Sequence, residues 1–443
     1  MSIVFPRDYK NKMEKATLCR EGVRKEHYSS LENKFGRGAA RAMEELYSLY
    51  DEGLYLWLAN LWEPSRGGFY YSNSARDTEG FGVDVESTAQ ALSFVSSSGL
   101  IDGRGSYYPE AITDSMKEKL LDFALGLQDE EDGYFYHPQW GKRVAPSRRG
   151  RDLGWAVSII RNLGRAPLYP SPLDRVKNDT APSTLPEYLQ DACAFRRYLA
   201  EFDLPESKYY HGKNSYGLGN LLQSQAGQII AAGNEYTKVL FDWLGDRQYD
   251  NGLWEEESGY DAVNGLMKMC LIYSAAGAQI PRAERALHET INAIRSTEAP
   301  GWVCVFYNPW ITASTLLNNI TKYGGGESAN KYRRIIRENA EEMIMVTKSK
   351  IEIFKKADGS FSYYPDRCSP SSQNARVALD NTNEGDVNGS CISSTGVTRN
   401  ICSALGTETI PLFSREDGDI FFELIETARE NRKIRPDPRG EKK

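Results

Sequence analysis

The sequence is poor in histidine, has no paired cysteine motif and contains no long apolar run, and each shortage excludes a class of protein. Histidine occurs only four times in 443 residues. The seven cysteines are scattered without a CxxC pair, which favours reduced thiols over a disulfide framework or a zinc cluster. No segment approaches the ~20 consecutive apolar residues that a membrane span needs. We therefore expect a globular chain with no membrane partner and no metal or other cofactor.

An excess of positive charge is also missing, because 54 Lys and Arg stand against 61 Asp and Glu, for a net charge of −7. Nucleic-acid binding favours a basic face, so nucleic acid is not an expected partner. Residues 1–22 lack the apolar core of a secretory signal peptide, which predicts a cytoplasmic location. Tyrosine, by contrast, is abundant, with 26 copies.

Six segments are rich in Ala, Ser, Gly and Thr, carry few charges, and end on glycine, the residue typical of the position after a helix. A helix with so few charges is expected to be packed on all sides. The six segments are 83–99, 151–164, 218–233, 260–277, 308–324 and 388–406. We predict that they form inner helices.

Longer, more charged amphipathic segments lie between them and predict outer helices with one solvated face. They are 41–62, 114–128, 185–203, 235–248, 282–296 and 329–354. A repeat of this length indicates one architecture for most of the chain. We expect an N-terminal extension over 1–40, a single helical domain over 41–432 with a last helix at 417–431, and a charged tail over 433–443.

Six outer helices alternating with six inner ones resemble the (α/α)6 toroid. This architecture is shared by polysaccharide lyases, many glycoside hydrolases, and the terpenoid cyclases with the protein prenyltransferases. The resemblance is to the architecture and identifies no particular family. It implies an all-α fold with a central cavity.

Turns followed by aromatic residues recur in the chain, as in LQDEEDGYFYHPQWG at 127–141. They all fall in the long loops that precede inner helices, so we expect them at one rim of the toroid. Ordered loops on a rigid scaffold often carry function, although these aromatics could serve only to fix the loops. The aromatic residues we expect to contact substrate are Tyr136, Trp140, Trp155, Tyr260 and Trp310.

The same rim favours an anionic ligand. Inner-helix N-termini that converge on a cavity bring partial positive charge there. The stretch 141–152 adds a cluster of cations, of which Lys142, Arg149 and Arg151 are predicted to bind substrate; the alternative is a solvated loop. Arg149 and Arg151 stand directly before an inner helix, and arginine suits a carboxylate or sulfate.

A β-elimination site needs a group that neutralises the uronate carboxylate, a base for the C5 proton and an acid for the leaving oxygen. Toroidal lyases combine Asn, His, Tyr and Arg for these roles, and the rim holds Asn214, Asn308 and Tyr307 among them. Tyr307 is the predicted base, with a phenol pKa lowered by a neighbouring arginine. His211 is the rival base and Tyr216 the rival acid.

Carboxylates offer a different chemistry, because two of them facing across the cavity would form a glycosidase pair. The alternative is that they cap helices, as Asp and Glu do at N-termini. The rim carboxylates are Asp84, Glu86, Asp152, Glu255, Glu256, Glu257, Asp261, Glu384 and Asp386. Of these, Asp152 and Glu256 are predicted to contact substrate.

Terpenoid chemistry is disfavoured. The sequence has neither a DxDD nor a DDxxD motif, and no histidine follows His288 to complete a prenyltransferase zinc site. The expected cavity lining is polar and sugar-like, with Asn220, Gln223, Gln225, Asn264 and Asn318. We therefore expect a lyase that cleaves an acidic poly- or oligosaccharide containing uronate, with a glycoside hydrolase as the alternative. A non-catalytic binding protein is a third hypothesis.

Overall fold

The computed structural model describes residues 9–101, 112–172, 187–324, 326–430, 433 and 435–438. Helices dominate these residues, and the prediction of a mainly helical chain is confirmed. Two short antiparallel hairpins supply the strands of the described ranges: β1 (Trp62–Glu63) with β2 (Gly68–Phe69), and β3 (Ser371–Ser372) with β4 (Ala375–Arg376). Within the same ranges, no helix combines the length and apolar character needed to cross a membrane.

Every predicted small-residue segment contains a helix, and we call these the small-residue helices. They are α5 (Val85–Ser97), α7 (Pro146–Asn162), α10 (Ser215–Ala232), α12 (Tyr260–Ala275), α14 (Cys304–Tyr323), and a continuous run of α17 (Val387–Cys391), a π-helical turn (Ile392–Gly396) and α18 (Val397–Leu405). Polar caps begin several of them. The side chains of Asp84, Asn214 and Asp386 accept hydrogen bonds from the first-turn amides of α5, α10 and α17.

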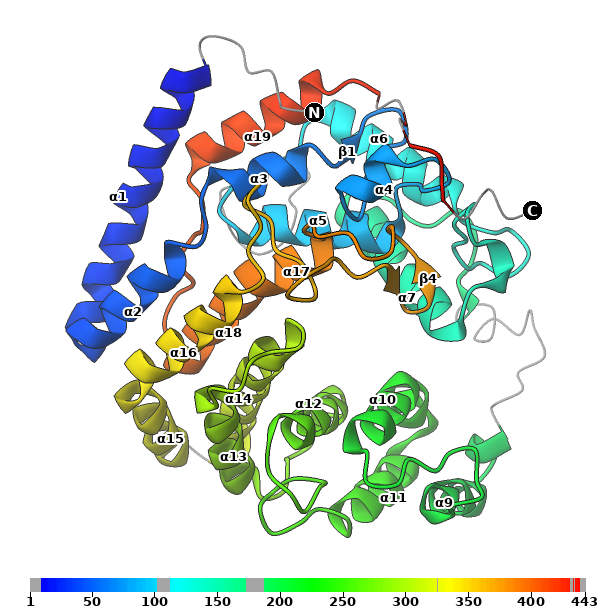
Figure 1. The fold of residues 1–443 in the computed structure, drawn as a ribbon. Coiled ribbons are helices and arrows are strands. Elements are labelled where there is room, and N and C mark those ends of the chain that lie inside the picture. Colours follow the sequence, from blue (N-terminus) through cyan, green and yellow to red (C-terminus); the bar gives the residue numbers. More distant parts are fainter. Residues whose placement is uncertain are drawn as a thin grey trace.

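The predicted amphipathic segments also fold as helices. Most of these lie towards the periphery in Figure 1, with the small-residue helices nearer the middle. They are α2 (Arg37–Tyr47), α3 (Glu52–Ala59), α6 (Asp114–Gly126), α9 (Ala192–Ala200), α11 (Asn234–Gly245), α13 (Ala283–Arg295), α15 (Gly326–Glu338), α16 (Ala340–Glu352) and α19 (Arg415–Thr427). Segments 41–62 and 329–354, each predicted as one helix, are interrupted and form the pairs α2–α3 and α15–α16. A short helix α4 (Asn73–Asp77) follows the β1–β2 hairpin.

Small-residue helices pack against one another, largely in chain order. Helix α5 contacts α7, α10 contacts α12, and α12 contacts α14. Helix α14 then contacts α18, and α17 returns to α5. Segments from the two ends of the sequence are therefore neighbours in the core.

The predicted N-terminal extension contains a long helix, α1 (Tyr9–Phe35), which packs along α2 and α19. Two buried arginines hold it in place. Arg20 binds Asp417 and Glu52, and Arg24 donates to the backbone carbonyls that end α2 and precede α19. Because α1 contributes buried residues to the common core, it is integrated with the helices that follow.

Helix α14 corrects one prediction. It begins at Cys304, so Pro309 lies inside the helix and not in its first turn. Proline lacks a backbone N–H, so the helix loses the hydrogen bond to the Val305 carbonyl, a single bond close to the helix end. Tyr307 is consequently a helical residue within α14 and is not the last residue of a loop.

Candidate functional site

A cavity of about 500 Å³ lies where α10, α12 and α14 begin. Its lining is mixed, with amides, carboxylates, hydroxyls, an amine and an indole. The lining residues are Lys213, Asn214, Tyr216, Glu255, Asp261, Asn264, Trp302, Cys304, Asn308 and Tyr363. We call this the rim cavity. Of the five amide residues expected to line the cavity, Asn264 does so, and Asn220, Gln223, Gln225 and Asn318 do not.

An amide pair joins two walls of the rim cavity. The Asn308 Nδ2 of α14 donates to the Asn264 Oδ1 of α12 over 2.7 Å. Each side chain uses one polar atom in this contact. The Asn308 carbonyl oxygen and the Asn264 NH2 group therefore keep hydrogen-bonding capacity for a ligand.

Lys268 brings a cation beside the rim cavity from the next turn of α12. Its Nζ lies 5.3 Å from the centre of the Tyr216 ring and donates to the Gln223 side chain over 3.0 Å. Burial lowers the pKa of the Lys268 amine, and the charge of Arg151 lowers it further. Lys268 thus has a larger neutral fraction than an exposed lysine.

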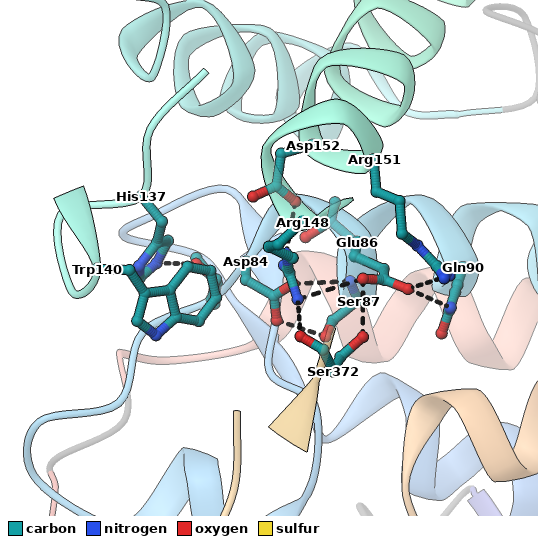
Figure 2. A network of polar contacts seen from close by, with 12 residues as sticks. Asp84, Glu86, Ser87, Gln90, His137, Trp140, Arg148, Arg151, Asp152 and Ser372 are labelled. Atoms are coloured by element: carbon teal, nitrogen blue, oxygen red, sulfur yellow. Dashed lines mark hydrogen bonds and ion pairs between the residues drawn. The ribbon is translucent and has the colours of Figure 1, made fainter. Parts of the chain in front are cut away.

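A buried charge network lies on the other side of the site and joins α5 to α7 (Figure 2). Arg148, 0% exposed, donates to Asp84 over 2.7 Å and to Asp152 over 2.8 Å, and it pairs with Glu86 at 3.2 Å. Glu86 also accepts from Ser372 of the β3–β4 hairpin. Burial among these carboxylates raises the pKa of Asp152 to about 7, against the opposing effect of Arg148.

Arg151 belongs to the same network and does not line the rim cavity, although its charge lowers the pKa of Tyr216, against the effect of burial, and that of Lys268, alongside it. Its guanidinium donates through one nitrogen to Glu86, and its side chain remains 40% exposed. Figure 2 shows Arg151 on the side of Glu86 away from Arg148. Because Glu86 is almost fully buried, it fixes Arg151 while the rest of the guanidinium stays open to a ligand.

The phenols around the site are proton donors. Burial raises the pKa of Tyr216, Tyr260 and Tyr363. Cys304, whose Sγ is 3.5 Å from the Tyr363 hydroxyl, also has its pKa raised by burial. These groups are protonated at neutral pH and could donate to a developing oxyanion.

The environment of Tyr307 does not favour the predicted phenolate. Burial raises the pKa of its phenol, and this outweighs the opposing charge of Arg399. Its ring packs against Gly396 in the π-helical turn, where an added Cβ would lie 3.0 Å from Cε2 of the ring. The predicted lowering of the Tyr307 pKa is therefore wrong, and this partly buried phenol is a proton donor and not a phenolate base.

Of the predicted catalytic and amide residues, Asn214, Tyr216 and Asn308 line the rim cavity. Tyr260 lies behind the lining residue Trp302, with ring centres 5.9 Å apart. His211 does not line the cavity. Its ring lies beside Phe202, and its buried Nε2 has no hydrogen-bond partner among the described residues.

Lys142, Tyr136 and Arg149, all predicted to bind substrate, contact residues of the segment 129–136. Lys142 forms ion pairs with Asp129 and Glu131, and the Tyr136 hydroxyl donates to Asp132. The Arg149 guanidinium lies 4.7 Å from the centre of the Tyr134 ring. These contacts support the solvated-loop alternative for Lys142.

Three predicted substrate contacts are structural. Trp310 is 0% exposed, and its indole N–H donates to Thr347 of α16, so the ligand-contact prediction is wrong. Asp152 is 3% exposed and forms an ion pair with Arg148. Trp140 stacks on Arg148 at 4.6 Å and donates to the Arg376 carbonyl. Trp310 and Asp152 are buried, and the indole N–H of the partly buried Trp140 is used by the Arg376 carbonyl.

Two further predicted contacts lie outside the lining. Trp155 is partly buried against the core, and Glu256 is exposed beside the lining residue Glu255. The sequence reading missed Lys213, Lys268, Trp302, Cys304 and Tyr363. The spacing Asp261–Asn264–Lys268, one residue per turn of a single face, was a signal for Lys268.

In the described ranges, no group of three or more His, Cys, Asp and Glu is arranged to hold a metal ion. Comparison with protein-family models, with curated proteins and with solved structures found no match to this chain.

Proposed function

We propose that the chain is an (α/α)6 toroid that cleaves a uronate-containing poly- or oligosaccharide by β-elimination in the rim cavity. The observation that supports this most is the lining itself. It combines an amide pair, protonated phenols and adjacent cations where several small-residue helices begin. Elimination from a uronate needs groups that neutralise its carboxylate, a base and an acid, and here the amides and cations suit the first role and the phenols suit the acid.

The uronate carboxylate accepts hydrogen bonds from the free Asn264 NH2 group and from Arg151, which withdraws negative charge and makes the C5 proton more acidic, while the free Asn308 carbonyl oxygen accepts from a sugar hydroxyl. Lys268 is the base, because its amine lies beside the lining residue Tyr216 and burial lowers its pKa, which raises the fraction of neutral amine. The C5–H electron pair forms the C4–C5 double bond as the C4–O bond breaks. Tyr216 or Tyr363 gives its proton to the departing oxygen.

The glycoside hydrolase remains a second candidate because of Glu255 and Asp261, which both line the rim cavity. Glu255 is held by the backbone N–H and the hydroxyl of Ser215. A carboxylate fixed in this way could activate water while a second carboxyl group protonates the leaving oxygen. Hydrolysis would use these two acids and leave Lys268 without a chemical role.

One experiment separates the two reactions. The protein is incubated with a panel of uronate polysaccharides while the ultraviolet absorbance of the unsaturated uronate product and the appearance of reducing ends are both followed. Elimination produces both signals, whereas hydrolysis produces reducing ends without absorbance. Lys268→Met should lower elimination by at least ~10²-fold, as expected for loss of a general base, while Glu255→Gln should do so for hydrolysis.

Folding of both variants is checked by circular dichroism and urea unfolding. Turnover with absorbance that survives in Lys268→Met would exclude Lys268 as the base. Absence of both signals across the panel would contradict the proposed activity.

A further inference from the structure

A second cavity, of about 330 Å³, lies where α12 and α14 end. Its lining is again polar, with hydroxyl, amide and amine groups. The lining residues are Leu271, Ser274, Gly277, Ala278, Thr315, Asn318, Asn319, Lys322 and Tyr323. We call this the far cavity, and the elimination chemistry does not use it.

Helix α12 connects the two cavities through one stripe of accessible residues. Between Asp261 and Ser274 the only residues that are not buried are Asn264, Lys268 and Leu271. These positions recur every three or four residues and therefore share one face of the helix. The first part of the stripe lines the rim cavity and the last part lines the far cavity.

Helix α14 carries a matching stripe. Between Tyr307 and Asn318 only Ile311 and Thr315 are not buried. Cys304 and Asn308 line the rim cavity at one end of this helix, and Thr315, Asn318 and Lys322 line the far cavity at the other. Helices α12 and α14 pack together, and both of them contribute residues to the rim cavity at one end and to the far cavity at the other.

The chemistry of this path suits an acidic sugar chain. Lys322 provides a cation at the far end, and the acids Glu255 and Asp261 both lie at the rim end. Lys322 lies 4.9 Å from the centre of the Tyr323 ring and has no carboxylate partner among the described residues. Ser274, Thr315 and Asn318 offer hydroxyl and amide groups of the kind that bind sugar hydroxyls.

Asn319 differs from these residues because both ends of its amide are used by the protein. It donates to the Ala278 carbonyl and accepts from the Ile280 N–H. It therefore shapes the far cavity and is not expected to bind ligand. Lys322 and Asn318, together with the hydroxyls of Ser274 and Thr315, are the groups left for recognition.

We propose that the far cavity is a second binding subsite for the same linear, acidic oligosaccharide, whose chain runs along α12 and α14 from the rim cavity. From Asn264 to Ser274 the helix advances by ~15 Å, which is longer than a single sugar ring. The inference rests on the proposed function, since the reacting unit occupies the rim cavity. It adds that Lys322 binds the carboxylate of a more distant unit, so the preferred substrate is a polymer with recurring acidic sugars.

The test measures the affinity of the full chain for size-defined oligogalacturonates, oligomannuronates and oligoglucuronates, from disaccharide to octasaccharide, by calorimetry. Wild-type protein should bind the octasaccharide of one series more tightly than the disaccharide. Lys322→Gln and Asn318→Ala should each weaken octasaccharide binding by about tenfold, the effect of losing ~1.4 kcal/mol of binding energy, and leave disaccharide binding unchanged.

Lys331→Gln is the matched control, because Lys331 lies in α15 and contacts the ring of the following residue, Tyr332, at 5.2 Å. It should bind both lengths as the wild type does. Unchanged octasaccharide binding in Lys322→Gln, or equal losses for both lengths, would overturn the far subsite while leaving the proposed function intact. If no oligomer binds to wild-type protein, the proposed function fails as well.

Discussion

Replacing Arg148 by methionine should destabilise the protein strongly, because it removes the cation at the centre of a buried network. Arg148 is 0% exposed and contacts Asp84, Glu86 and Asp152, all of which are almost fully buried. Methionine keeps much of the side-chain length, so the change tests the charge more than the packing. Glu86 would retain Arg151, and Asp84 would retain Ser87. No other cation in the described part of the chain pairs with Asp152.

Removing one partner of a buried ion pair typically costs about 3–5 kcal/mol, because the remaining charge stays buried without compensation. We expect a loss of this size in the free energy of unfolding of Arg148→Met at pH 7. The loss should shrink as the pH falls, since protonated carboxyl groups no longer need the guanidinium. Urea unfolding followed by circular dichroism and tryptophan fluorescence measures both effects.

The neighbouring Arg149 provides the control. It is partly exposed and stacks on Tyr134, a contact worth about 0.5–1 kcal/mol at such a site. Arg149→Met should therefore cost no more than about 1 kcal/mol. If Arg148→Met cost as little as Arg149→Met at pH 7, or if its penalty grew towards acidic pH, the assignment of Arg148 as the neutralising cation would be refuted.

Three further predictions concern Asp152, Tyr307 and Trp310. Asp152 has a folded-state pKa of about 7, above its ordinary value of 3.8, so between these pH values the folded chain binds more protons than the unfolded chain. The free energy of unfolding should therefore fall as the pH rises through this window. Asp152→Asn should reduce this fall, as measured by the urea midpoint at a series of pH values. Tyr307→Phe should keep turnover within about threefold of wild type, well short of the ~10²-fold loss of a general base, in initial-rate assays at neutral pH. Trp310→Phe should lower the free energy of unfolding by about 1–3 kcal/mol through the lost bond to Thr347, with an unchanged KM; a raised KM would return Trp310 to the binding site.

The helices were predictable from the sequence because their pattern is local. Small residues with few charges mark α12, and glycine at 277 marks the position after its end. The caps could also be read from local chemistry. The alternative that rim carboxylates cap helices is confirmed for Asp84 and Asp386, each of which accepts from the amide three residues later. The accessible amide face of α12 likewise follows from the periodicity of one helix.

Contacts between distant segments were not predictable. The indole of Trp310 is held by Thr347, and the ring of Tyr307 packs against Gly396. Both partners lie far along the chain from the residue they contact. Propensity and motif patterns carry no information about which buried surface a helix will meet. A pKa that depends on burial could not be assigned without that packing, so the predicted phenolate had the wrong sign of shift.

In the cationic stretch at 141–152, the position at which α7 begins determines the direction of each arginine side chain. Helix α7 begins at Pro146, a residue favoured in the first turn, and so Arg148, Arg149 and Arg151 are helical. Successive helical residues turn by about 100°, so the three side chains leave in different directions. Arg148 shares a face with Asp152 and points into the protein, Arg149 contacts the ring of Tyr134, and Arg151 pairs with Glu86. Three neighbouring arginines in the sequence thereby become one buried cation, one cation stacked on an aromatic ring and one partly exposed cation.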